Sequence, residues 1–244
     1  MTNTTTRSGR NVQRSTTSKR ISLTDSVHDA LRDRIIFSEI PAGEILAEGR
    51  LAEEHGVSKT PVREALALLS QQGLIEVLPR VGYRVTDISV QDVHDVFRLR
   101  SLLESDAAAL AAKRAPQVDV LAFREWTSGE LDRLDQEQHM SQKTYTQFHD
   151  AFHLGVTILA ESTRLTRFVG SLLSDSTRIR VRDPLMSVEG FEEDRELTAQ
   201  LTDALLSRDE TLAAKLMREH LEQSKDRILT RLSNPERRSR RMPL

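Results

Sequence analysis

The segment from Val57 to Thr86 constrains the fold of this chain more than any other part of the sequence. It runs VSKTPVREALALLSQQGLIEVLPRVGYRVT, and its two halves differ in character. The first half predicts an amphipathic helix, because Thr60 is a suitable N-cap, Pro61 suits the first helical position and Gly73 closes the segment. The stripe expected to be buried is Val62, Leu66 and Leu69.

The second half of this segment predicts a β-hairpin, with strands at 74–78 and 83–86 and a turn that contains Pro79 and Gly82. Two helices are expected before it. Apolar positions recur at helical spacing from Leu23 to Ile35, and a short helix at 50–55 ends at Gly56. Helix, short helix, tight turn, helix and hairpin is the order of a winged helix-turn-helix domain. In that fold the second helix of the pair enters the major groove of DNA.

The charge of this region has to be weighed by its location. Residues 21–88 contain seven cations and eleven acids, whereas residues 57–86 contain four cations and two acids. Location matters more than the total for a DNA-facing surface. The order of elements therefore indicates DNA recognition, with a winged helix that only contacts proteins as the alternative. The cations near the predicted recognition helix and hairpin are Lys59, Arg63, Arg80 and Arg84.

Residues 56–85, GVSKTPVREALALLSQQGLIEVLPRVGYRV, resemble the GntR family of bacterial transcription regulators. The resemblance implies binding to double-stranded operator DNA through the second helix and the wing. Lys59 stands where the family usually has arginine. Gly49 stands where many members have an arginine that contacts DNA, so the neighbouring Arg50 is a further candidate. The family contacts carried over by position are Ser58, Lys59, Thr60, Arg63, Arg80 and Gly82.

Everything after Asp87 is expected to be helical. Ser89 caps a long helix that ends before Pro116, and later breaks leave helices at roughly 117–138, 142–161, 164–182, 190–207 and 209–231. Helices of this length predict an antiparallel bundle, which builds ligand sites from side chains on facing helices. The expected fold class is mainly α, with a winged helix-turn-helix domain at 21–88 and an all-α bundle at 89–232.

The motif HDAFH places His149 and His153 four residues apart on a predicted helix. Metalloproteases use this spacing to hold one metal ion. The enzyme interpretation fails at the general base, because the protease motif has Glu directly after the first histidine and Asp150 is a methylene shorter. The sequence also lacks a phosphate-cradling glycine loop, a nucleophile elbow and a dinucleotide-binding motif. We therefore do not expect an enzyme.

The second half of the chain resembles the FCD-type effector domain, the helical module of the FadR branch of the GntR family. The resemblance lies in FRLRSLLESDAAALAA, QFHDAFHLGV and LTAQLTDALLSRDETLAAKLMREHL. It implies a homodimer that binds a small effector, usually a carboxylate, beside a divalent metal held by one Asp and three His. His153 and His220 match two of these ligands. His149 occupies the Asp position, and Thr198 occupies the third His position.

Three interpretations of these residues stay open. In the first, His149, His153 and His220 hold zinc or nickel and leave a position for the effector. In the second, the pocket is metal-free, and Thr198 and the histidines bind the effector directly. In the third, the histidines on the HDAFH helix are ordinary polar residues beside an apolar stripe that contains Phe152.

Arg100 is a further candidate for effector binding, because an arginine among apolar positions of a long helix needs an anionic partner. The partner is either an effector carboxylate, met by a bidentate fork, or Glu104 one turn away. The charged runs DSTRIRVRD and EGFEEDREL are expected to be solvated helix faces or ends. Arg178 in the first run is a candidate to approach the pocket.

The ends of the chain are basic, although the whole chain has a net charge of −2. Residues 1–20 carry five cations and no acid, and the tail 233–244 carries four arginines and one acid. Both are expected to be disordered, and the arm either keeps the protein in solution or binds phosphates. The arm has no apolar run, so neither a signal peptide nor a membrane anchor is expected and the protein is assigned to the cytoplasm.

These features predict a ligand-responsive transcription regulator, usually a repressor in the family it resembles. Two winged helices of a homodimer would read the halves of a palindromic operator. The alternative is a constitutive DNA-binder whose helical domain only dimerises. Because the chain has no cysteine, disulfides and thiolate zinc sites are excluded.

Overall fold

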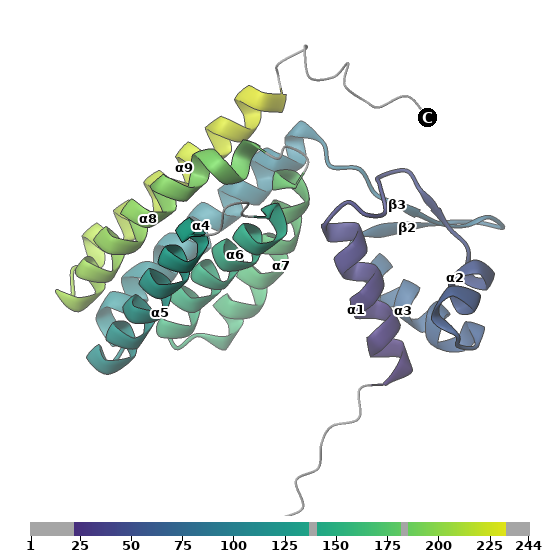
Figure 1. Cartoon of the computed structure of the whole chain (residues 1–244), viewed down its shortest axis with the longest axis horizontal. Helices are drawn as coiled ribbons and strands as arrows, with labels where there is room; N and C mark the ends of the chain where they lie inside the picture. Colours follow the sequence, from purple (N-terminus) through teal and green to yellow (C-terminus); the bar gives the residue numbers. More distant parts are fainter. Residues whose placement is uncertain (1–21, 137–140, 182–184, 233–244) are drawn as a thin grey trace, which may run out of the picture.

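The computed structural model describes residues 22–136, 141–181 and 185–232, so the predicted basic arm and tail lie outside the described residues. Figure 1 shows two parts, a small helical domain with a sheet and a bundle of long helices. This arrangement confirms the expected fold class. The first part consists of α1 (Leu23–Ile36), β1 (Ile45–Leu46), α2 (Glu48–His55), α3 (Lys59–Gln71), β2 (Ile75–Leu78) and β3 (Gly82–Val85). The second consists of α4 (Val90–Arg114), α5 (Gln117–Gln136), α6 (Gln142–Leu159), α7 (Thr163–Arg180), α8 (Leu185–Leu206) and α9 (Glu210–Leu232).

The start of α3 corrects one prediction. Ser58, with extended backbone angles (φ −71°, ψ 166°), is the N-cap, and Thr60 already lies inside the helix. Pro61 is tolerated two positions further in than predicted, because the first four N–H groups of a helix have no partner within it. The predicted stripe is buried as expected. It joins the core of the domain, which includes Val27, Leu31, Ile35, Leu46, Leu51, Val62, Leu66, Leu69, Ile75 and Val85.

The sheet has the strand order β1-β3-β2, and both pairs are antiparallel. The hairpin of β2 and β3 was predicted. The first strand was not, because two residues are too few to show an alternating pattern. Pairing of Leu46 with Tyr83 defines it. The side chain of Leu46 is fully buried, so β1 ties the loop after α1 into the core.

Gly82 brings the wing close to β1. Its φ is +139°, and a Cβ added there would lie 2.5 Å from the carbonyl oxygen of Leu46. We expect Gly82→Ala to destabilise this domain by roughly 1–3 kcal/mol through backbone strain, and by a similar amount through the overlap. Gly73→Ala is the matched control, because Gly73 has a φ of +74° but open space around an added Cβ. Amide hydrogen exchange of α3 and β2 measures the loss of stability in both variants. Equal loss of protection in the two would contradict the overlap argument.

The central helix of the bundle is α4, against which α6, α7, α8 and α9 all pack. A capping box starts it, in which Ser89 accepts from the backbone N–H of Asp92 and Asp92 accepts from that of Ser89. The next helix in the chain, α5, packs against α6 and α8. Short connections after α4, α6 and α8 reverse the chain, as in an antiparallel bundle. One boundary differs clearly from the prediction, since α8 begins at Leu185 rather than near residue 190.

One helix of the bundle, α7, also contacts the first domain. Arg32 on α1 donates to Ser174 Oγ on α7 at 2.7 Å. Arg178, near the end of α7, donates to the backbone carbonyl of Thr86 at 2.6 Å. Thr86 follows β3, and its hydroxyl donates to the carbonyl of Gly73. The two domains are thus joined by hydrogen bonds as well as by the chain between β3 and α4.

Candidate functional site

The predicted DNA-contacting residues lie on the exposed start of α3 and on the wing. Ser58, Lys59 and Thr60 are all exposed. Arg80 is exposed at the wing tip with a φ of +67°, beside Gly82. These placements agree with a protein surface that can meet a groove of DNA, and the contacts themselves remain predictions.

Several cations of this surface are paired with acids of the same domain. Arg63 donates to both carboxylate oxygens of Glu48 on α2. Arg50 reaches Glu44 at 3.3 Å, and Arg84 reaches Glu76 on the neighbouring strand. A Cβ added at Gly49 would lie 3.8 Å from Lys59 Cε, so the position that lacks the family arginine is next to Lys59.

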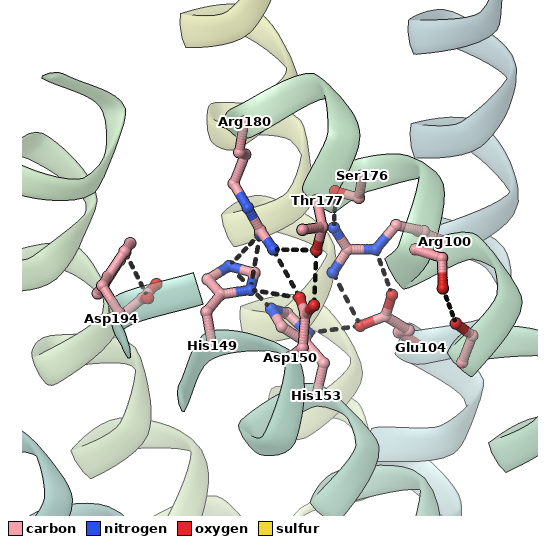
Figure 2. A network of polar contacts seen from close by, with 12 residues as sticks. Arg100, Glu104, His149, Asp150, His153, Ser176, Thr177, Arg180 and Asp194 are labelled. Carbon is pink, nitrogen blue, oxygen red and sulfur yellow. Dashed lines mark hydrogen bonds and ion pairs between the residues drawn. The ribbon is translucent and has the colours of Figure 1, made fainter. Parts of the chain in front are cut away.

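The second candidate site is in the bundle, where three histidines from two helices meet; Figure 2 shows two of them, His149 and His153, with the polar residues around them. His149 and His153 lie on α6, and His220 lies on α9. One ligand-capable nitrogen from each lies within 4.8 Å of the others, and all three side chains are buried. Nε2 of His149 and Nε2 of His153 are 3.3 Å apart. The helical spacing of the HDAFH motif places the first two together, and the packing of α4 against both α6 and α9 brings the third close.

Burial of the three histidines favours their uncharged form. Burial lowers the pKa of His149 and His220 well below the ordinary value, and nearby arginines lower both further. Burial also lowers the pKa of His153, although Glu104 partly opposes the shift. Neutral imidazoles retain a lone pair, which is the form that binds a metal ion or accepts a hydrogen bond.

The partner of Arg100 in this structure is Glu104. Arg100 Nε lies 2.6 Å from Glu104 Oε1, both side chains are buried, and Arg100 Nη1 donates to Ser176 Oγ at 2.8 Å. The other carboxylate oxygen, Oε2, lies 2.5 Å from His153 Nδ1. Burial alone would raise the pKa of Glu104, but Arg100 and His153 outweigh it and lower the pKa to about 2. Of the two partners considered for Arg100, the internal ion pair is the one present here.

Arg180 contacts the histidine cluster and was not among the predicted site residues. The run DSTRIRVRD was expected to be solvated, but Arg178 and Arg180 are only 6% and 8% exposed, because α7 is covered on several sides. Arg180 Nη1 lies 2.7 Å from Nδ1 of His149, and Nη2 lies 2.6 Å from Asp150 Oδ1. Arg178 points to Thr86 rather than to the histidine cluster. Asp150 also accepts from Thr177, so it balances the charge of Arg180.

Asp194 is a second missed residue, from the run EGFEEDREL that was also expected to be solvated. It is 3% exposed and accepts from the hydroxyl of Tyr145 at 2.7 Å. Its other oxygen lies 3.7 Å from His220 Nε2. Burial raises the pKa of Asp194 to about 7. The charged residues around Asp194 in the sequence do not indicate its burial. The side chain is covered by α6 and α9, which are distant from it in the sequence.

Several buried polar atoms of the bundle have no hydrogen-bond partner within the described part of the chain. They include Thr198 Oγ1, His220 Nε2 and Arg180 Nε. Buried polar groups normally have partners, so such a set indicates a place for water, an ion or a ligand. The donor set fits zinc or nickel, because three neutral imidazoles converge and Glu104 fixes the ring of His153 through its Nδ1.

Comparison with known proteins supports the two-domain arrangement. Residues 23–85 match the family described as "Bacterial regulatory proteins, gntR family", and residues 95–223 match the FCD domain. The chain is 31% identical over 197 residues to the HTH-type transcriptional repressor GlaR of Escherichia coli, covering 78% of this chain and 89% of that protein. It is 27% identical over 187 residues to the Nta operon transcriptional regulator of Aminobacter aminovorans, covering 77% and 85%.

The fold is also found among solved structures. Escherichia coli McbR/YncC superposes with a TM-score of 0.71 at 22% sequence identity, and the match covers 87% of this chain and 100% of that one. At this identity the likeness supports the fold only.

Proposed function

Since the chain belongs to the GntR family of bacterial regulatory proteins and carries an FCD domain, we propose that a small carboxylate bound in that domain controls its affinity for operator DNA. The chain is a DNA-binding transcription regulator and not an enzyme. In our proposal it acts in the cytoplasm as a homodimeric repressor, and its two winged helices read the halves of a palindrome.

The observation that carries this proposal is the set of buried, partly unpartnered polar groups around the histidines. Thr198 and His220 each have an unpartnered atom, and Arg180 offers an unpartnered Nε–H. A carboxylate supplies acceptors for such donors, and its charge is favoured beside a guanidinium. Arg100 is already held by Glu104 and Ser176, so a direct fork to the effector would require that pair to open.

In the metal-dependent form of the proposal, His149, His153 and His220 hold one zinc or nickel ion. The ion would supply a positive centre that orients the effector carboxylate. Glu104 would act as a positioning residue, because its bond to Nδ1 of His153 leaves Nε2 facing His149. In the metal-free form, Thr198 and the histidines would bind the carboxylate themselves.

The route from pocket to DNA-binding domain would run through α7. Thr177 and Arg180 contact groups in the pocket, whereas Ser174 and Arg178 contact the first domain. These residues occupy the last two turns of one helix. An effector that draws Arg180 away from His149 would therefore shift the helix end that holds Thr86. A ligand shifts an equilibrium only by its differential affinity for the two arrangements.

The test uses duplexes selected from random DNA by the purified protein. Fluorescence anisotropy then gives the affinity for a selected duplex with each of a panel of mono-, di- and tricarboxylates, with and without zinc. We expect at least one acid to change the affinity by about 5–150-fold, the usual range of allosteric coupling. If calorimetry shows that an acid binds in the pocket while the DNA affinity stays constant, the chain is a constitutive DNA-binder.

The variant Arg178→Ala separates binding of the effector from the effect of the effector on DNA affinity. We expect this variant to bind the acid as the wild type does, because Arg178 points to Thr86 and not into the pocket. The effect of the acid on DNA affinity should fall several-fold or disappear, since a contact between the domains is lost. Arg164→Ala, an exposed position on the same helix, is the matched control. A full response in Arg178→Ala would contradict the route through α7.

A further inference from the structure

The bidentate ion pair between Arg63 and Glu48 joins the two helices of the helix-turn-helix. Arg63 is on α3 and Glu48 is the first residue of α2. Arg63 Nε lies 3.0 Å from Oε1 and 3.2 Å from Oε2, and Nη2 lies 2.8 Å from Oε2. The carboxylate therefore accepts hydrogen bonds from the Nε–Nη2 edge of the guanidinium.

This geometry leaves the other edge of the guanidinium open. A guanidinium has five N–H donors in a rigid plane, so Nη1 and the second N–H of Nη2 remain available. These N–H groups form the terminal edge of the guanidinium, which is the edge that donates to O6 and N7 of guanine in the major groove. The Arg63 side chain is 64% exposed at the start of the recognition helix. The pair with Glu48 and a contact with guanine can thus exist together.

The position of Glu48 allows it to order the side chain of Arg63. It lies in the first turn of α2, where the helix dipole favours a carboxylate, and its side chain is only 24% exposed. The hydrogen bond from Arg63 lowers the pKa of Glu48, although burial opposes this shift. A free arginine loses about 2 kcal/mol of side-chain entropy when it is ordered. An arginine already ordered by Glu48 would lose less of it on binding DNA.

The other cations of this surface are held differently. Lys59 and Arg80 are exposed, and neither makes a salt bridge among the residues that the structure describes, although Lys59 acts electrostatically on Glu48. Arg50 makes a single contact with Glu44 at 3.3 Å, and Arg84 meets one oxygen of Glu76 on the wing. Exposed cations without partners suit phosphate contacts, which fix position but carry no sequence information.

We propose that Glu48 is a specificity-determining residue that does not itself touch a base: it fixes the fork of Arg63 for one guanine in each half-site. The negative charge of Glu48 weakens attraction to the phosphates and so lowers the affinity for DNA of any sequence. By ordering Arg63, Glu48 increases the preference for guanine over the other bases. The inference rests on DNA binding by the winged helix and is independent of the effector pocket.

The experiment is selection of binding sites from random duplex DNA, followed by anisotropy with duplexes that differ at one base pair. Four variants of the full chain are compared with the wild type. Arg63→Ala should lose the preference for guanine at one position of each half-site. Glu48→Gln should reduce that same preference about tenfold, within the 5–150-fold expected of a good bidentate contact, and should bind random-sequence DNA more tightly.

Glu48→Asp separates position from charge, because it keeps the carboxylate but shortens its reach by a methylene. We expect it to reduce the guanine preference without raising affinity for random DNA. Glu53→Gln is the matched control, since it removes an exposed charge from the same helix. The proposal is overturned if Glu48→Gln keeps the full guanine preference, if Glu48→Asp behaves as the wild type, or if Arg63→Ala selects the same sites. Failure of the wild type to select any sequence would instead refute operator recognition itself.

Discussion

Replacement of Glu104 by alanine should lower the free energy of unfolding of the bundle by about 3–5 kcal/mol, the usual effect of breaking a buried ion pair. The variant leaves the guanidinium of Arg100 buried without its carboxylate, and it removes the acceptor at His153 Nδ1. The single tryptophan, Trp126, lies in α5, so its fluorescence follows unfolding of this domain in urea.

A surface ion pair provides the matched control. Glu219 lies one turn from Lys215 on α9, and both side chains are exposed. Its replacement by alanine should cost at most about 0.5 kcal/mol. The double variant Arg100→Met with Glu104→Met should recover most of the stability lost in Glu104→Ala, because apolar pairs often replace buried ion pairs well. A small effect of Glu104→Ala, similar to that of Glu219→Ala, would contradict the buried pair.

The same pair gives a pH dependence with a defined sign. The pKa of Glu104 falls from 4.5 to about 2 in the folded chain. A carboxyl group with a lowered pKa stabilises the fold above its unfolded pKa and loses that contribution as the pH falls through the folded one. The difference in stability between wild type and Glu104→Ala should therefore shrink between about pH 4.5 and pH 2.

Zinc or nickel should raise the stability of the bundle by about 4 kcal/mol when the free metal is a thousand times its dissociation constant. The reason is that the three histidines converge only in the folded chain, so the unfolded state has no equivalent site. Urea unfolding followed by Trp126 fluorescence, with chelator-treated protein before and after metal is added, measures the effect.

Two histidine variants define the origin of that stabilisation. His153→Ala removes a nitrogen from the centre of the cluster and should abolish most of the gain. His94→Ala removes an exposed histidine on α4 and should leave it unchanged. Stabilisation of the same size in His153→Ala would place the metal elsewhere.

The winged helix was predictable because its signals are local. Cap, proline, apolar stripe and turn glycine all fall within one run of sequence, and each constrains its neighbours directly. The start of α3 was predicted two residues too late, with Thr60 instead of Ser58 as the N-cap. Both residues are suitable N-caps, and sequence alone does not rank them. The strand β1 was missed because its pairing with β3, and not its own pattern, defines it.

The pocket was predictable only in part. His149 and His153 are paired by helical spacing, and the resemblance added His220 and Thr198. Arg180 and Asp194 were not found, because their charged surroundings in the sequence suggest solvent. Their burial depends on which helices pack over α7 and α8, and local composition carries no information about that packing.

The central claim of the metal-dependent proposal is that three buried histidines form a divalent metal site in the FCD domain. The most direct test is elemental analysis of protein purified without a histidine tag, for the wild type beside His153→Ala. The account predicts one zinc or nickel ion per chain in the wild type and none in the variant. Wild-type protein that contains no metal, and that takes up none when zinc or nickel is supplied, would contradict it.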